Sequence, residues 1–111
     1  MTLREFGTLL ESVVPNIGHF KAKRRGFPRI VYGETERLYF CTDNKPTFKR
    51  WKVEVRFFTR EDFDPTVEQL EDLFVAHNIP FDLVAVEYGA IPIDGKTFDE
   101  GVIYYLFECE V

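Results

Sequence analysis

The sequence contains few of the residues that most often perform covalent chemistry. It has two cysteines, Cys41 and Cys109, two histidines, His19 and His77, and a single serine, Ser12. Ser12 has no histidine or aspartate near it, the cysteines form no CxxC motif, and the histidines lack metal-ligand spacing. A nucleophile–base pair between Cys41 and either histidine is left open, but we expect both cysteines to be small buried thiols. These absences predict no catalysis, no metal and no cofactor.

Long apolar runs are also missing. No run approaches the roughly 20 residues that a membrane helix needs, and the N-terminus is amphipathic, unlike a secretory leader. The chain has 111 residues, of which 45% are hydrophobic and 12 are Phe. This is enough apolar material for the core of one domain. We therefore expect a single soluble intracellular domain over residues 1–111.

Basic residues are nearly absent from the second half of the chain. Residues 1–18 carry a net charge of −1, and residues 19–60 hold twelve basic and four acidic residues, a net charge of +8. Residues 61–111 hold one basic and thirteen acidic residues, a net charge of −12. Such asymmetry indicates either a polyanion site or a surface that meets its opposite on another copy of the chain.

Two segments show helical periodicity. Thr2 and Glu5 have capping-box spacing, and apolar residues recur every three or four positions from residue 3 to residue 14. In the second segment Asp64-Pro65 is typical of a helix start, and Asn78 of a helix end. The apolar stripe of this second helix comprises Val67, Leu70, Phe74 and His77.

Five segments have strand character. They are residues 29–33, 38–42, 48–59, 81–88 and 101–111. The third alternates strictly, with Trp51, Val53, Val55 and Phe57 on one face. The last begins apolar on both faces, which predicts burial on both sides in its first half. Turn signals lie at residues 43–46 and at Asp94-Gly95, and residues 19–27 are predicted to form an exposed basic loop.

These elements predict an α+β domain. An antiparallel sheet of about four to five strands would be packed by two helices, in the order α-β-β-β-α-β-β. Adjacent acidic residues, such as Glu71 and Asp72, point apart on a helix or strand and indicate a solvated acidic face rather than an acid–base pair.

The chain resembles the tail-completion proteins of long-tailed bacteriophages and prophages, also called tail terminators or head–tail joining proteins. The resemblance covers nearly the whole chain, by order and spacing rather than by a catalytic signature. The basic run at 21–25 and the aliphatic stretch at 83–86 are not part of the pattern. The matching runs are LLE at 9–11, FPRIVY at 27–32, TDNK at 42–45, WKVEVRF at 51–57, TR at 59–60, VEQLEDLF at 67–74 and IYYLFECEV at 103–111.

This resemblance implies a structural virion protein of the phage tail, assembled in the host cytoplasm. Such a protein caps the tail tube as a ring, typically a hexamer, and joins tail to head without catalysis. Its partners would be further copies of itself, the tail tube protein and the head–tail connector protein. DNA would pass only transiently through the ring, and no membrane would be involved.

A closed ring needs two different patches that meet between neighbouring copies, and opposite charges can supply them. The alternatives are another small head–tail connector or assembly adaptor, and a nucleic-acid-binding protein that uses basic segment 21–29. In that last case Tyr32, Tyr39, Phe48 and Trp51 would supply stacking. The candidate subunit-interface residues are Lys21, Lys23, Arg24, Arg25, Arg50, Glu68, Glu71, Asp72, Asp99 and Glu100.

Overall fold

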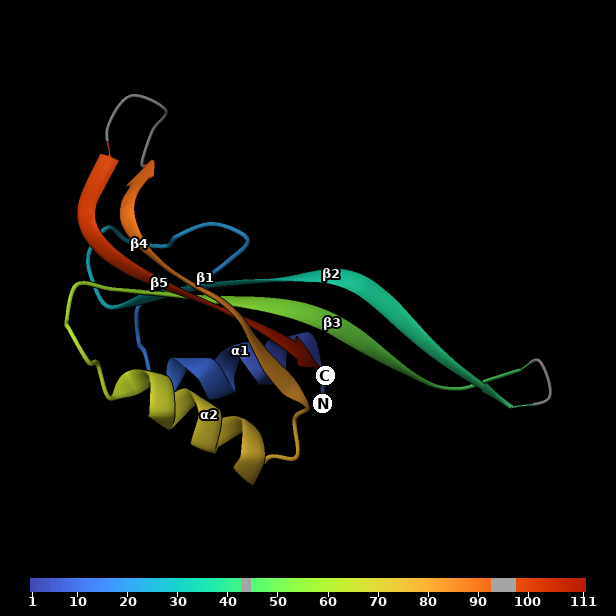
Figure 1. Cartoon of the computed structure of the whole chain (residues 1–111). Coiled ribbons are helices and arrows are strands. Elements are labelled where there is room, and N and C mark those ends of the chain that lie inside the picture. Colours follow the sequence, from blue (N-terminus) through green and yellow to red (C-terminus); the bar gives the residue numbers. More distant parts are fainter. Residues whose placement is uncertain (43–44, 93–97) are drawn as a thin grey trace.

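A five-stranded mixed sheet with both helices on one face makes up the protein (Figure 1). The computed structural model describes residues 1–42, 45–92 and 98–111. The predicted α+β class and the element order α-β-β-β-α-β-β are confirmed. The elements are α1 (Leu3–Glu11), β1 (Ile17–His19), β2 (Arg29–Thr42), β3 (Lys45–Thr59), α2 (Thr66–Ala76), β4 (Phe81–Pro92) and β5 (Phe98–Glu110).

The strand order in the sheet is β1-β2-β3-β5-β4. The sheet is mixed rather than antiparallel as predicted, because β1 runs parallel to β2; the other three neighbouring pairs are antiparallel. One row of paired residues crosses all five strands: Ile17, Ile30, Phe57, Tyr105 and Val86. This register fixes which residues of the two edge strands, β1 and β4, lie at the same height.

The core lies between the sheet and the two helices. Val53, Val55 and Phe57 of β3 are fully buried, as the alternation predicted. Phe6 of α1 and Phe74 of α2 stack with ring centroids 6.2 Å apart, which joins the two helices over the sheet. Burying each such ring contributes roughly 1.5–3 kcal/mol.

Both helices begin as their sequences predict. The Thr2 hydroxyl accepts a hydrogen bond from the Glu5 backbone N–H at 3.1 Å. At α2, the buried Asp64 carboxylate accepts from the Thr66 backbone N–H at 2.9 Å and from the Thr59 hydroxyl at 2.7 Å. The bonds from Glu5 and Thr66 satisfy backbone donors that have no partner within the helix, and the bond from Thr59 holds the Asp64 carboxylate in place.

Two hairpins extend beyond the helix-covered part of the sheet, at opposite ends (Figure 1). Trp51 exchanges two backbone hydrogen bonds with Val111, of 2.7 and 2.9 Å, at the end of β5. Beyond that point β2 and β3 pair only with each other, through residues 37–42 and 45–50, which we call the arm. At the other end, β5 pairs with β3 only from Ile103 onward. The part of β5 before Ile103 pairs with β4 alone.

Three strand predictions need correction. The segments 29–33 and 38–42 form one strand, β2, because a register shift between Glu34 and Glu36 absorbs the polar stretch that suggested a break. β1 was missed, since Pro15 and Gly18 indicate a turn; its neighbours Asn16 and Phe20 hold it to β2 through hydrogen bonds of 2.9 and 2.7 Å. The expected burial of β5 on both faces is met in part, because Val102 is buried while residues 103–106 are partly exposed.

Side-chain predictions for Cys41 and His77 are also wrong. Cys41 is exposed on the arm, where no helix covers β2, whereas Cys109 is buried as expected. His77 is exposed at the end of α2, beyond the part of the helix that contacts the sheet. In the predicted turn 43–46, residues 45 and 46 belong to β3; residues 43–44 and the Asp94-Gly95 turn lie outside the described residues. No helix in the described part of the chain is long and apolar enough to cross a membrane.

Candidate functional site

The basic loop between β1 and β2 forms the first candidate surface. Lys21, Lys23, Arg24 and Arg25 are all exposed, as predicted for this loop. The loop turns back sharply after β1, since a Cβ at Gly18 would collide with the Lys21 carbonyl oxygen. Among the residues that the structure describes, none of the four cations has a carboxylate partner. Their positive charge is therefore available to another molecule.

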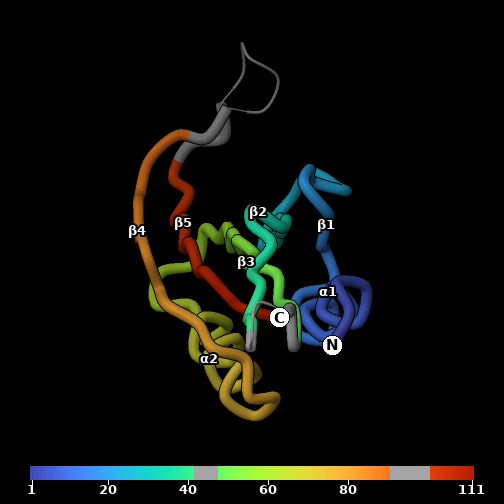
Figure 2. The backbone as a smooth tube through the Cα atoms, turned by 90° about the vertical axis from the view of Figure 1, so that its right-hand side faces the viewer, coloured from blue at the N-terminus to red at the C-terminus, as the bar shows by residue number. Residues whose placement is uncertain are grey.

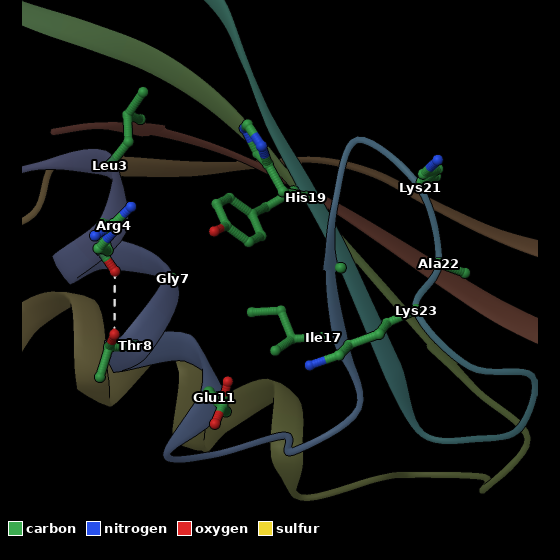
Figure 3. Close-up of a pocket in the computed structure, with 12 residues that line it drawn as sticks. Leu3, Arg4, Gly7, Thr8, Glu11, Ile17, His19, Lys21, Ala22 and Lys23 are labelled. Carbon is green, nitrogen blue, oxygen red and sulfur yellow. Dashed lines mark hydrogen bonds between the residues drawn. The ribbon is translucent and has the colours of Figure 1, made fainter.

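A groove of about 750 Å³ lies beside this loop, between it, α1 and β1 (Figure 3). Arg4 from α1 and Lys21 and Lys23 from the loop line it, opposed by a single acidic residue, Glu11. In Figure 3 the Lys23 side chain extends from the loop toward Ile17 at the base of the groove. The groove therefore presents a positive surface along the free edge of β1.

A polar pair anchors β1 at this groove. The His19 Nε2 atom lies 2.7 Å from the Glu34 carboxylate, and the His19 ring lies 5.1 Å from that of Tyr32. Burial favours a higher pKa for Glu34, but the hydrogen bonds from His19 and from its own backbone outweigh it, so the Glu34 pKa is lowered. Burial, with the nearby charges of Glu34 and Glu11, raises the pKa of Tyr32. This pairing orients the His19 ring toward Glu34 of β2.

The acidic face of α2 forms the second candidate surface. Leu70 and Phe74 of α2 are fully buried, while Glu68 and Asp72 are exposed and Glu71 is partly exposed. α2 contains no basic residue, and none of its three acids has a cationic partner among the described side chains. The negative charge of this helix is therefore available in the same way.

The two charged surfaces lie near opposite edges of the sheet, one beside β1 and the other beside β4 (Figure 2). Phe6 of α1 contacts Tyr32 of β2 with ring centroids 6.3 Å apart, which places α1 beneath the β1–β2 side. Phe74 of α2 contacts Phe81 of β4 at 5.2 Å and Phe107 of β5 at 5.7 Å, which places α2 beneath the β4–β5 side. The width of the sheet therefore keeps the basic loop and the acidic helix apart within one chain.

The remaining predicted interface residues belong to other parts of the molecule. Arg50 lies at the base of the arm, where its guanidinium is 3.9 Å from Glu110 of its own chain and 5.6 Å from the Phe48 ring centroid. Asp99 and Glu100 belong to β5, and the structure describes their backbone and not their side chains. The structure thus groups Lys21–Arg25 together and Glu68–Asp72 together, and it separates Arg50 from both groups.

Two exposed apolar surfaces were not among the predicted interface residues. On the arm, Tyr39 and Phe48 are 59% and 50% exposed. On β4, Val86 and Tyr88 are 55% and 77% exposed. The signal for β4 was the aliphatic run at 83–86, which has no charged residue to mark one face as solvated. On the arm, the sequence had indicated Tyr39 and Phe48 only as stacking residues for nucleic acid, because nothing in it shows where the covering helices end.

No protein-family model matches the sequence, and no curated protein matches it. The chemistry of the described residues must therefore be judged on its own terms. They contain no group of three or more His, Cys, Asp or Glu side chains arranged to hold a metal. Burial raises the pKa of the Cys109 thiol to about 12, so this thiol stays protonated and unreactive at neutral pH.

Proposed function

We propose that the protein is a structural subunit that assembles head to tail into a ring, which caps a phage tail tube and joins tail to head. The observation that carries the assembly is the separation of two unpaired charge clusters of opposite sign near the two edges of one sheet. A head-to-tail interface brings different patches of neighbouring copies together. The basic loop of one copy then meets the acidic α2 of the next.

Charge alone does not hold such an interface. Exposed ion pairs contribute about 0–1 kcal/mol each, so the loop and α2 mainly steer association and set its register. Buried apolar contacts carry most of the affinity in protein interfaces. The exposed side chains of β4, such as Leu83 and Val86, supply that apolar area.

The phage setting rests on the resemblance of the sequence to tail-completion proteins. It supplies the tail tube protein and the connector protein as partners, the virion tail as the location, and DNA as a transient passenger. The proposal requires no cofactor. A small connector adaptor would use the same charged surfaces on a different partner, and would stay monomeric on its own.

Charge reversal tests the assembly directly. We expect R24E/R25E and E68K/D72K each to weaken self-association at least about 10-fold, or about 1.4 kcal/mol, because attraction becomes repulsion. All four residues are on the surface, so circular dichroism should show an unchanged fold. Native mass spectrometry and light scattering at about 0.05 and 0.5 M salt measure association, which should weaken as screening increases.

Complementation provides the control. The chain with all four substitutions keeps the wild-type net charge and restores both attractive pairs, so it should assemble. An equimolar mixture of the two double variants should form rings in which the two variants alternate. Such a ring can close only if it has an even number of subunits. Failure of the fourfold variant to assemble while the wild type does would show that these two surfaces do not meet.

A nucleic-acid role is the second candidate, favoured by the unpaired cations around the groove. The predicted segment 21–29 loses one of its cations, because Arg29 is buried with its guanidinium 4.6 Å from the Phe27 ring and 5.1 Å from the Phe58 ring. A gel shift with short duplex and single-stranded DNA separates the two functions. Tight binding at about 0.15 M salt that R24E/R25E abolishes would favour nucleic acid, since phosphate contacts dominate such binding.

A further inference from the structure

The outer edge of β4 is open. β4 is twelve residues long and ends the strand order, with β5 on its inner side. No strand in the described part of the chain pairs with its outer side. Backbone N–H and C=O groups along such an edge are free to pair with another strand, and soluble proteins usually protect long edges with charges or proline.

β4 carries two exposed charges, Asp82 and Glu87, but most of its other exposed side chains are apolar. Leu83, Val84, Val86 and Tyr88 are 41, 51, 55 and 77% exposed. A bulge between Leu83 and Ala85 displaces Val84, but residues 85–89 pair regularly with β5. Four neighbouring exposed apolar side chains on one edge strand are typical of an interaction surface.

The opposite edge of the sheet is β1, whose residues lie level with those of β4 across the sheet. The residue row that begins at Ile17 of β1 ends at Val86 of β4, and the row that begins at His19 ends at Leu83. One parallel and three antiparallel pairings separate the two strands, so β1 and β4 run in opposite directions. A rotated copy placed beside the first therefore offers β1 to β4 in antiparallel orientation, with neither copy inverted.

We propose that β4 of one copy pairs with β1 of the next copy, so that the sheet continues from subunit to subunit. This inference rests on the proposed head-to-tail assembly and names the strands that form it. The occupant of the β4 edge is then a second copy of this chain.

The surfaces that border the two edges favour this pairing. The positive groove with Arg4, Lys21 and Lys23 lies beside β1 on the helix-covered face. The acidic face of α2, with Glu68 and Asp72, lies on that same face beneath β4 and β5. Pairing β4 with β1 thus places opposite charges together, whereas pairing β4 with another β4 places acidic helices side by side.

A cysteine cross-link tests the pairing in the full chain. We use His19→Cys with Leu83→Cys in a Cys41→Ser background, since Cys41 is exposed and Cys109 is buried. Facing residues of antiparallel strands have Cα atoms about 4.5–5.5 Å apart, within the span of a disulfide. Mild oxidation should convert most chains into a ladder of dimers and higher species on a non-reducing gel. The single-cysteine variants and His19→Cys with Asp62→Cys are the controls.

A second variant covers a shift in register. Leu83→Lys with Val86→Lys places charges on side chains that are already exposed, so the monomer should fold while assembly is lost at both low and high salt. Phe63→Lys is the matched control, because Phe63 is 91% exposed in the connection between β3 and α2. It should assemble like the wild type.

The outcomes separate this inference from the proposed function. Rings without the cross-link, combined with normal assembly of the lysine variant, would overturn the strand pairing and leave the head-to-tail ring standing. Near-complete dimers from Leu83→Cys alone would show β4 against β4 and overturn the pairing. Loss of assembly in the lysine variant without the cross-link would place β4 against a surface other than β1, which also overturns it. A wild-type chain that stays monomeric at high micromolar concentration would overturn the proposed assembly itself.

Discussion

The same two strands, β2 and β3, pass through two different environments. In the helix-covered body of the sheet, Val55 and Phe57 of β3 are fully buried. In the arm, Phe48 of the same strand is 50% exposed and Tyr39 of β2 is 59% exposed. Both parts of these strands carry aromatic side chains, and the body differs from the arm in being covered by α1 and α2 and flanked by β5.

This difference divides the aromatic residues by role. A two-stranded ribbon is marginally stable alone, so the arm depends on the body and on local contacts. These contacts are the Phe40–Phe48 stack, with centroids 4.5 Å apart, and the Arg37 guanidinium 4.3 Å from the Trp51 ring centroid. Aromatic side chains in the body hold the fold, and those in the arm remain available to a partner.

The largest expected effect comes from breaking the body. Phe57→Ala removes a fully buried ring whose centroid lies 6.1 Å from that of Tyr105, so we expect a loss of about 3–5 kcal/mol in the free energy of unfolding. Urea denaturation measures it. A loss below about 1 kcal/mol would mean that the core repacks easily, and the contrast between body and arm would fail.

The fold was largely predictable because its signals are local and strong. The Thr2–Glu5 cap, the stripe around Leu70 and Phe74, and the alternation of β3 all mark their elements by spacing. β1 was missed because three residues carry too little periodicity, and its pairing with residues 30–32 is a tertiary interaction. The exposure of Cys41 was missed because sequence alternation does not reveal where a covering layer ends.

The candidate site was predictable in composition and not in arrangement. Charge asymmetry identified residues 21–25 and the acids of α2, but the sequence alone does not place them near opposite edges of a sheet. Arg50 belongs to the same basic half, yet the antiparallel register brings it to Glu110 of its own chain. Long-range pairing, rather than local charge, decides which ionic groups remain available.

An intermediate effect is expected at Asp64, where the body connects β3 to α2. Burial favours a higher pKa for this carboxyl, but hydrogen bonds from Thr66 and Thr59 outweigh it, so the Asp64 pKa lies below its ordinary value. The ionised form therefore stabilises the fold above about pH 4, and this contribution disappears as the pH falls through about 4 toward the folded-state pKa. Asp64→Asn should lower the free energy of unfolding by about 1–2 kcal/mol at pH 7. In urea titrations from pH 7 to 3, the free energy of unfolding of this variant should fall less with pH than that of the wild type. An equal acid dependence in both chains would contradict this role.

The smallest effect on stability is expected in the arm. Phe48→Ala removes one side of the Phe40–Phe48 stack on an exposed ribbon, so the free energy of unfolding should fall by less than about 1 kcal/mol. If the sheet continues laterally through β4 and β1, the strands run along the ring axis and the arm projects from one rim, toward an axial partner. Phe48→Ala should then leave the ring intact in light scattering and weaken its binding to the tail tube protein in a pull-down. Phe63→Ala, another exposed ring outside the arm, is the matched control and should bind normally. A stability loss comparable to that of Phe57→Ala would make the arm part of the core, and loss of the ring would assign Phe48 to the contact between subunits.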